Sequence, residues 1–183
     1  MRPKRSGRVL ATDGPVVLTL GHSRHGIAGF VALAKSHGID TVIDVRGQPY
    51  SRFNPQFNRE RFAASLEDAG IGYVWEGERL PGRPRDRKLH TTDGAVDWAA
   101  LRAAPGFAAG IDAVLERAAA GRIALVCAEE DPLRCHRRFL LTPPLIERGA
   151  RVVHVRGDGR AETEADVAAR QKGAATPQLD LFG

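Results

Sequence analysis

The sequence predicts an α/β fold, a three-layer sandwich with a mostly parallel sheet at its centre. Short apolar runs rich in β-branched residues alternate with longer segments whose apolar residues recur at helical spacing. Most of these segments end in glycine, proline or polar residues that mark a turn. Because alternating strands and helices place successive strands in parallel, we expect helices on both faces of the sheet.

The first half of the chain predicts strand–helix units. Strands are expected at residues 16–20, 41–45 and 73–75. Helices are expected at residues 27–37 and 58–69. Gly38 and Gly70 follow these helices and are typical C-terminal stops, and Asn58 is the expected N-cap of the second helix.

The second half continues the alternation after a long interruption. Residues 76–96 form a charged loop rich in proline and glycine, and a loop of this length in a compact domain is usually functional or disordered. Helices are expected at residues 97–104, with Asp97 as cap, 107–120 and 135–148. Strands are expected at residues 123–127 and 152–155.

These elements predict one folded domain with Rossmann-like or rhodanese-like topology. The chain has 183 residues, which is long enough for one domain with a sizeable core. We expect a flexible basic arm over residues 1–14, the α/β domain over 15–157 and a flexible tail over 158–183. The tail is expected because its composition is polar and rich in alanine.

Charge and cysteine content restrict the class of protein. The net charge of +5 is compatible with DNA, a nucleotide or another anionic partner. No apolar stretch approaches the roughly 18 residues that span a bilayer, so we expect no membrane association. Two cysteines cannot build a disulfide framework, which favours a reducing cytoplasm. Nothing in the sequence sets the oligomeric state or requires a cofactor.

Reactive side chains concentrate in residues 126–138, between a predicted strand and a predicted helix. This segment holds both cysteines, Cys127 and Cys135, together with Glu129, His136 and Arg137. In an open α/β sheet, ligands bind where strands end and helices begin. The segment therefore predicts a functional site.

Two further strand ends are expected to face the same crevice. His22 and Ser23 follow the first strand, while Asp44 and Arg46 close the second and Arg52 lies just beyond it. Arg46, Arg52 and Arg137 are expected to hold an anion, because guanidinium groups match phosphate geometry. Glu129 or Asp44 would act as acid or base, and Cys127 or Cys135 as nucleophile or pocket lining. His22 and His136 would transfer protons.

The same residues allow structural interpretations. Asp44 is a candidate to bond loop amides with Arg46 as its ion-pair partner, and Cys127 is a candidate small core residue. Zinc is a further alternative, because Cys127, Cys135, His136 and His22 carry suitable donor atoms. The cysteines are eight residues apart, however, which is not the spacing of a zinc knuckle.

A strand, a cysteine, a loop and a helix is also the layout of rhodaneses and cysteine phosphatases. Val42-Ile43-Asp44-Val45-Arg46 resembles the Asp-x-Arg strand of rhodanese domains. The phosphatase pattern places five residues between cysteine and arginine, whereas six separate Cys127 from Arg134 here. Acids in the same loop would repel a phosphate. Sulfur transfer by a thiolate therefore stays open, and phosphatase activity is disfavoured.

The order of motifs resembles domain-of-unknown-function family number 488 over about residues 16–157. The motifs that carry the resemblance are Thr19-Leu20-Gly21-His22-Ser23, Asp44-Val45-Arg46 with Pro49, Ser51 and Arg52, Ile71-Gly72-Tyr73, Cys127-Ala128-Glu129 with Pro132, Cys135-His136-Arg137 and His154. The resemblance implies an α/β sandwich with a pocket and no agreed reaction. Leu80-Pro81-Gly82 departs from the usual Leu-Gly-Gly, and a proline removes an amide donor at that position.

The C-terminal residues carry a second signal. Gln178-Leu179-Asp180-Leu181-Phe182 resembles the peptide by which many bacterial DNA polymerases and repair proteins bind the sliding clamp. The resemblance implies hydrogen bonds from Gln178 and apolar anchoring by Leu181 and Phe182, with Leu179 between them. The alternative is a C-terminus that folds back and packs its leucines on the domain.

Three functions follow from these observations. The first is an enzyme that acts on a nucleotide, nucleic-acid or other anionic substrate in DNA maintenance and is recruited by the tail peptide. The second is a non-catalytic DNA-associated adaptor or nucleotide-sensing module, which needs the arginines and the tail but neither Cys127 nor Glu129. The third is a thiol or sulfur-transfer enzyme of rhodanese-like layout.

Overall fold

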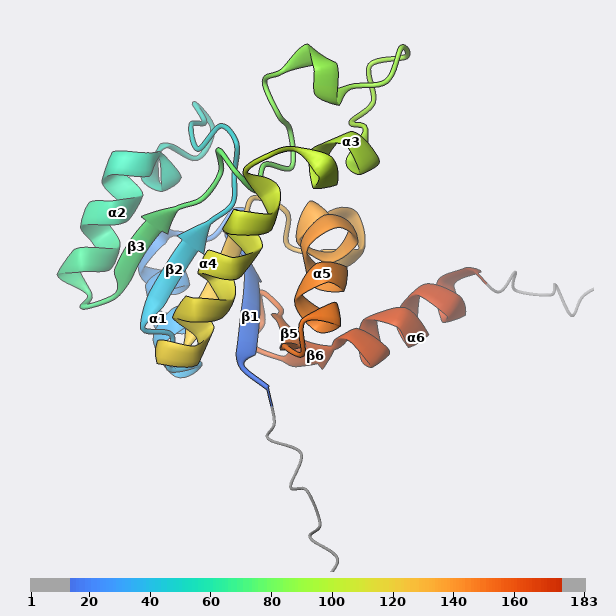
Figure 1. Ribbon diagram of the computed structural model, residues 1–183. Coiled ribbons are helices and arrows are strands. Elements are labelled where there is room, and N and C mark those ends of the chain that lie inside the picture. Colours follow the sequence, from blue (N-terminus) through green and yellow to red (C-terminus); the bar gives the residue numbers. More distant parts are fainter. Residues whose placement is uncertain (1–13, 176–183) are drawn as a thin grey trace, which may run out of the picture.

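The computed structural model describes residues 14–175, and within them six strands form one sheet (Figure 1). The strands are β1 (Val16–Gly21), β2 (Thr41–Asp44), β3 (Gly72–Trp75), β4 (Ile123–Cys127), β5 (Arg151–Val155) and β6 (Ala161–Thr163). Their order across the sheet is β3-β2-β4-β1-β5-β6. All neighbours are parallel except β5 and β6, so the predicted α/β fold with a mostly parallel sheet is confirmed.

Helices cover both faces of the sheet. They are α1 (Ile27–Ser36), α2 (Arg59–Asp68), α3 (Trp98–Ala103), α4 (Phe107–Ala120), α5 (Thr142–Glu147) and α6 (Glu164–Ala175). Phe30 of α1 and Phe62 of α2 pack with Leu20 of β1 on one face. Ile111 of α4 and Leu145 of α5 pack on the opposite face (Figure 1).

Strand alternation explains why one sheet serves two cores. In β4, Ile123 and Leu125 belong to the core under α4 and α5, whereas Ala124 and Val126 belong to the core under α1 and α2. Successive side chains of a strand point to opposite faces, so a strand buried on both sides must be apolar throughout. All five residues of β4 are buried, which matches its continuous apolar sequence.

The connections create a crevice at the carboxyl end of β4. The chain leaves β1 and β2 toward the face covered by α1 and α2, whereas it leaves β4 toward the face of α5. Because β4 lies between β2 and β1, the connections on either side of it diverge. Such a switch point is where open α/β sheets bind ligands. The strand order exchanges β1 and β4 relative to the 3-2-1-4-5-6 order of dinucleotide-binding folds.

The prediction of a flexible tail from residue 158 was wrong for residues 161–175. Residues 161–163 form β6, which pairs antiparallel with β5, and residues 164–175 form α6. Val167 of α6 is fully buried. The polar composition misled the prediction, because α6 is attached largely by ion pairs. Residues 1–13, which hold most of the predicted basic arm, and residues 176–183, which hold the clamp-binding-like peptide, lie outside the described residues.

The single helix predicted over residues 135–148 was also wrong. Residues Arg137–Leu141 form a π-helical turn, and α5 begins only at Thr142. Pro143 and Pro144 have no backbone N–H, so they cannot complete the ladder of an uninterrupted α-helix. The Thr142 hydroxyl instead donates to the Arg137 carbonyl oxygen at 2.9 Å.

The predicted helix ends are confirmed, but one predicted cap is not. Gly38 and Gly70 adopt φ angles of +63° and +74°, the left-handed conformation that ends a helix. The Asp97 side chain accepts the Ala100 N–H at 2.9 Å and caps α3 as predicted. Asn58 precedes α2, but its side-chain oxygen accepts the Ser51 N–H at 2.7 Å and makes no hydrogen bond to the helix.

Candidate functional site

Cys127, Cys135 and His136 converge at the carboxyl end of β4. The Cys127 Sγ lies 3.5 Å from the His136 Nδ1, and the Cys135 Sγ lies 3.9 Å from the same nitrogen. The two sulfur atoms and the nitrogen all lie within 4.8 Å of one another, and both cysteines are free thiols. The sequence-predicted cluster is therefore brought together by a turn of only seven residues.

The surroundings of Cys127 favour its thiolate. A hydrogen bond with Cys135 lowers the pKa of Cys127 to about 7, assisted by the charge of Arg137 and by the backbone amides of Glu129 and Ala128. Burial opposes this shift, because it disfavours the charged form. The same hydrogen bond, together with burial, raises the pKa of Cys135. Of the two thiols, Cys127 therefore ionises first, and Cys135 stays protonated at neutral pH.

Arg137 holds the connection that carries these groups. Its side chain is 1% exposed. Its guanidinium donates to the carbonyl oxygens of Glu129 and Glu130 at 2.7 and 3.2 Å and to the Cys135 Sγ at 3.1 Å. These contacts face the protein interior. Arg137 was predicted to bind an anionic substrate, but in this arrangement it fixes the loop and the Cys135 sulfur.

Asp44, Arg46 and His22 form a second buried group beside the thiols. The Arg46 guanidinium donates to both Asp44 carboxylate oxygens at 2.8 and 2.6 Å. It also donates to the Phe57 carbonyl oxygen at 2.8 Å. Tyr73 adds a hydroxyl donor to Asp44 at 2.7 Å. Asp44 is fully buried, so its carboxylate has the structural surroundings that the sequence left open as an alternative.

His22 is held as a neutral imidazole. Its Nε2 lies 3.1 Å from the Arg46 Nη1, which can only donate, so Nε2 accepts and Nδ1 donates to the Ser23 carbonyl oxygen. Burial, followed by the charge of Arg46, lowers the pKa of His22 to about 4. The ring also stacks on Phe57 at a centroid distance of 4.3 Å. This histidine supports Arg46 and stays uncharged at neutral pH.

An open hollow of about 660 Å³ lies over the thiols, and we call it the thiol hollow. Its lining includes Arg46, Gly82, Arg83, Cys127, Glu129, Arg134, Cys135 and His136, and we call its exposed aromatic residues, Tyr50, Trp98 and Phe139, the rim. The three rim aromatics are 55%, 38% and 45% exposed, respectively. Glu129, Arg83 and Arg134 are exposed as well. The hollow thus combines a thiol of lowered pKa with exposed cations and aromatic rings.

The long loop predicted to be functional contributes to this hollow. Arg83 and Gly82 come from the segment between β3 and α3, which rises beside the carboxyl ends of the strands (Figure 1). A Cβ atom on Gly82 would lie 2.4 Å from the His136 Nδ1, so the backbone passes against the imidazole face. Neither Arg83 nor Trp98 was among the predicted site residues. Their position depends on how the long loop folds, which no periodic pattern indicates.

Two predicted substrate-binding residues lie elsewhere. Arg52 is exposed, and its guanidinium carbon lies 4.7 Å from the centroid of the Phe53 ring. It does not line the thiol hollow. Ser23 has a φ of +44°, and its N–H donates to the Ala128 carbonyl oxygen at 2.9 Å. Ser23 therefore positions the connection after Cys127 through its backbone.

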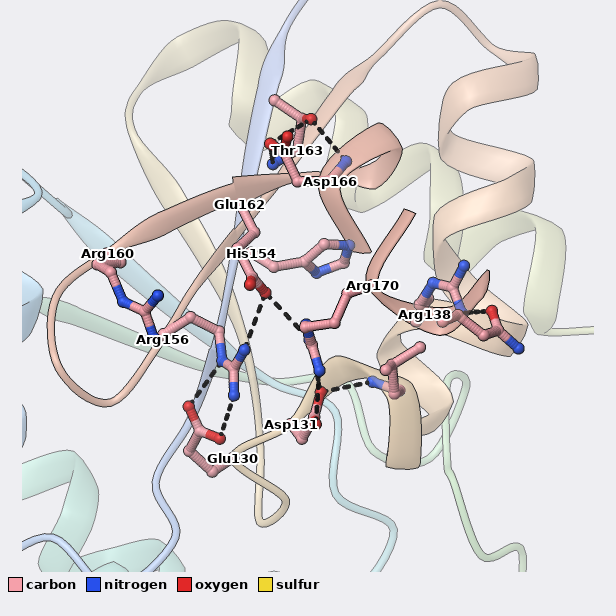
Figure 2. A network of polar contacts seen from close by, with 12 residues as sticks. Glu130, Asp131, Arg138, His154, Arg156, Arg160, Glu162, Thr163, Asp166 and Arg170 are labelled. Carbon is pink, nitrogen blue, oxygen red and sulfur yellow. Dashed lines mark hydrogen bonds and ion pairs between the residues drawn. The ribbon is translucent and has the colours of Figure 1, made fainter. Parts of the chain in front are cut away.

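The acids next to Glu129 do not line the thiol hollow and instead join an ion-pair network (Figure 2). Glu130 receives two hydrogen bonds from Arg156 at 2.8 and 2.9 Å. Asp131 receives two from Arg170 of α6, both at 2.9 Å. Glu162 of β6 accepts from both arginines. The network ties the site loop to the C-terminal elements and leaves Glu129 as the acid of this run that lines the hollow.

Cys127, Cys135 and His136 carry three donor atoms close enough together to bind a metal ion, but their fit to zinc is incomplete. A tetrahedral zinc with sulfur ligands at about 2.3 Å and nitrogen at about 2.0 Å separates sulfur from nitrogen by about 3.5 Å. The Cys127–His136 distance of 3.5 Å fits this value, and the Cys135–His136 distance of 3.9 Å is longer. The other ring nitrogen of His136, Nε2, is buried without a hydrogen-bond partner. Zinc-binding histidines almost always have such a partner, so the fit is incomplete.

Comparison with known families places this site in a wider group. Residues 26–142 match the family described as domain of unknown function DUF488. The chain belongs to this family. The DUF488 match contains Arg46, Cys127, Cys135 and His136, and it ends before β5 and α6. No curated protein and no solved structure matches the chain. Membership confirms the family resemblance and supplies no reaction.

Pro81, in the Leu80-Pro81-Gly82 segment, is buried beside a neighbouring hollow. Pro81 packs closely against Gly47, because a Cβ atom built on Gly47 would lie 2.9 Å from the Cβ atom of Pro81. Pro81 lines a hollow of about 1010 Å³ between the long loop and the start of α4, which shares Gly47, Tyr50 and Arg83 with the thiol hollow.

Among the helices of residues 14–175, none combines the length and apolar character needed to cross a bilayer.

Proposed function

We propose that this DUF488 protein is a thiol-dependent enzyme that acts on a nucleotide or nucleic-acid substrate in DNA maintenance. One observation carries the proposal: the Cys127 sulfur lines a hollow whose walls hold arginines and whose rim holds exposed aromatic rings. Thiolates react as nucleophiles, and a pKa near the ambient pH suits that role. The lowered pKa of Cys127 supports this assignment.

The chemistry of the walls favours an anionic substrate that carries an aromatic ring. Arg83 and Arg134 are exposed cations, unlike the internally bonded Arg46 and Arg137. Guanidinium groups bind phosphates through paired N–H donors. Bases stack on aromatic side chains with a gain of about 1–3 kcal/mol each, a role open to Tyr50, Trp98 and Phe139. Nucleotides and single-stranded nucleic acids present both features.

In the proposed reaction, the Cys127 thiolate displaces a leaving group from an electrophilic carbon of the substrate. A sulfur–carbon bond forms, and the leaving group departs with the electron pair of the bond that breaks. Glu129, an exposed carboxylate in the same hollow, would then take a proton from a water that attacks this carbon. The carbon–oxygen bond forms as the sulfur–carbon bond breaks, and its electron pair restores the Cys127 thiolate. The charge of Arg137 beside the thiols favours the thiolate at Cys127.

Binding can be measured by titrating nucleoside monophosphates and a short single-stranded DNA while following tryptophan fluorescence. We expect saturable quenching that is weakened at least tenfold in the Arg83→Ala/Arg134→Ala double variant. Arg117→Ala is the control for charge loss at one position, since this exposed residue lies near the end of α4, away from the carboxyl ends of the strands. Equal affinity in all three proteins would contradict the proposed substrate site.

Recruitment is proposed to come from the clamp-binding-like peptide at residues 178–182. Gln178, Leu179, Leu181 and Phe182 lie outside the described residues, so the proposal depends on their sequence alone. The test is a titration of the bacterial sliding clamp with the full chain and with a chain lacking residues 177–183. Binding that disappears with the tail supports recruitment, and no binding by either form contradicts it.

Catalysis is separated from an adaptor role by substitution in cells. Cys127→Ser and Glu129→Gln remove the proposed nucleophile and base while leaving the exposed arginines and the tail in place. If both variants retain a DNA-damage phenotype that tail deletion abolishes, the enzyme proposal fails and a non-catalytic adaptor replaces it.

A further inference from the structure

We propose that Cys127 and Cys135 form a redox pair, in which a hydroperoxide oxidises Cys127 and Cys135 closes an intramolecular disulfide. The inference rests on the proposed function in one respect, because both require a reactive Cys127 thiolate. It adds a second reaction for the same sulfur and assigns Cys135 a chemical role. In the proposed substrate reaction, Cys135 only lowers the pKa of Cys127 and takes no part in bond formation.

The geometry of the pair carries the inference. The two sulfur atoms lie within 4.8 Å of one another, with the His136 Nδ1 near both. Both cysteines are reduced in the structure. The Arg137 Nε donates to the Cys135 Sγ at 3.1 Å and so fixes one sulfur beside the other. A disulfide requires the sulfurs to approach to about 2.05 Å.

The two sulfurs differ in the way that a two-step oxidation needs. The pKa of Cys127 is lowered, and its side chain is 9% exposed in the thiol hollow. Cys135 is 2% exposed, and its raised pKa keeps it protonated while the first step proceeds. Susceptibility to oxidation follows thiolate character and access, so Cys127 is the residue that reacts first.

The reaction balances in two steps. The Cys127 thiolate attacks one oxygen of hydrogen peroxide, the S–O bond forms as the O–O bond breaks, and hydroxide leaves. Sulfur is oxidised and the peroxide is reduced. The Cys135 sulfur then attacks the Cys127 sulfur, the S–S bond forms as the S–O bond breaks, and a second hydroxide leaves. The Cys135 proton combines with that hydroxide to give water, with His136 Nδ1 within reach of both sulfurs.

The disulfide would remove the nucleophile of the proposed enzyme and protect it from irreversible oxidation. Sulfenic acids that meet no second thiol are oxidised further to sulfinic acid, which cells rarely reduce. A neighbouring Cys135 traps the sulfenic acid first. The protein would then lose its thiol reactivity under peroxide and regain it with a dithiol reductant.

The test treats the full-length protein with one equivalent of hydrogen peroxide and measures intact mass and linked peptides. We expect a loss of two hydrogen atoms, a peptide joining Cys127 to Cys135, and reversal by dithiothreitol. Cys135→Ser should instead accumulate a sulfenic acid at Cys127 that dimedone traps. Cys127→Ser is the matched control and should leave Cys135 unoxidised under the same conditions.

Alkylation of the untreated protein by iodoacetamide distinguishes the two proposals. If Cys127 is alkylated rapidly but peroxide yields no Cys127–Cys135 bond, the redox pair is refuted and the nucleophile stands. If Cys127 resists both reagents, both proposals fail. If one zinc ion accompanies each chain and reactivity appears only after chelation, the pair is a metal site and the redox inference is overturned.

Discussion

The reactivity proposed for Cys127 depends on the neighbouring thiol of Cys135, which is the largest cause of its lowered pKa. We predict that the rate of alkylation of Cys127 by iodoacetamide rises with pH and reaches half its maximum near pH 7. Cys135→Ala removes the strongest contribution to the lowered pKa, so the midpoint should move toward the ordinary value of about 8.5. Peptide mass spectrometry at a series of pH values measures both curves. Superimposable curves would show that Cys135 has no influence.

Gly82 tests how closely the long loop supports the site. Gly82→Ala would place a methyl group 2.4 Å from the His136 Nδ1, so the ring must move. We expect a loss of about 1–3 kcal/mol in the free energy of unfolding, as for other overpacked sites. Gly29→Ala is the control, because a Cβ there meets nothing within 4 Å in α1. That control should gain about 0.5–1 kcal/mol, and both changes are measurable by denaturant unfolding.

His22 should make stability depend on pH. Its folded-state pKa is lowered to about 4, whereas the unfolded value is about 6.5. Below pH 6.5 the unfolded chain binds a proton at His22 that the folded protein does not. The free energy of unfolding is therefore highest above pH 6.5 and falls by about 3 kcal/mol as the pH decreases toward 4. His22→Phe keeps a ring to stack on Phe57 but cannot be protonated. Unfolding free energies of the two proteins at pH 7 and pH 4 should diverge, and parallel pH curves would contradict this explanation.

At the scale of elements, α6 and β6 hold the loop that follows β4. We predict that Arg156→Met lowers the free energy of unfolding by about 1–3 kcal/mol, because Glu130 and Glu162 lose a partly buried partner. Arg160→Met is the matched control, since Arg160 pairs with Asp158 at a 72% exposed position. Such surface pairs contribute less than about 1 kcal/mol. Equal destabilisation of both variants would show that the network has no special role.

Periodic elements were predictable from the sequence because their signals are local. β4 and the helix at 107–120 were recognised from apolar patterns, and the structure places them within a residue of the prediction. The α6 helix was missed because ion pairs such as Arg170–Asp131 attach it, and their partners are distant in sequence. The prolines at 143 and 144 were visible, but the π-helical turn that accommodates them follows from packing.

The sequence predicted which residues gather at the site better than it predicted what each side chain does there. Convergence of Cys127, Cys135 and His136 followed from a single strand–loop–helix segment. The sequence could not show that Arg46 and Arg137 bond inward, because a guanidinium near a strand end looks the same in either role. Nor could it show that Arg83 lines the thiol hollow, because the long loop has no periodic pattern from which its conformation could be predicted.

At the scale of the whole molecule, the sheet topology forms the crevice and the net charge favours anionic partners. The diverging connections around β4 open the crevice in which Cys127 lies, and the long loop and the start of α3 add Arg83 and Trp98 to its lining. The net charge of +5 would favour the approach of nucleic acid from solution. We therefore predict that the affinity for single-stranded DNA falls steeply with salt, as phosphate contacts require. Binding measured from low to high salt that does not weaken would exclude phosphate recognition.

The most direct test of the central claim is the rate of Cys127 alkylation at pH 7 in the presence of a single-stranded oligonucleotide. If the thiol hollow is the substrate site, the oligonucleotide should slow alkylation saturably. Protection should persist in Arg117→Ala and disappear in Arg83→Ala/Arg134→Ala. An oligonucleotide that binds the protein while Cys127 reacts at an unchanged rate would contradict the claim, because the substrate would then lie elsewhere.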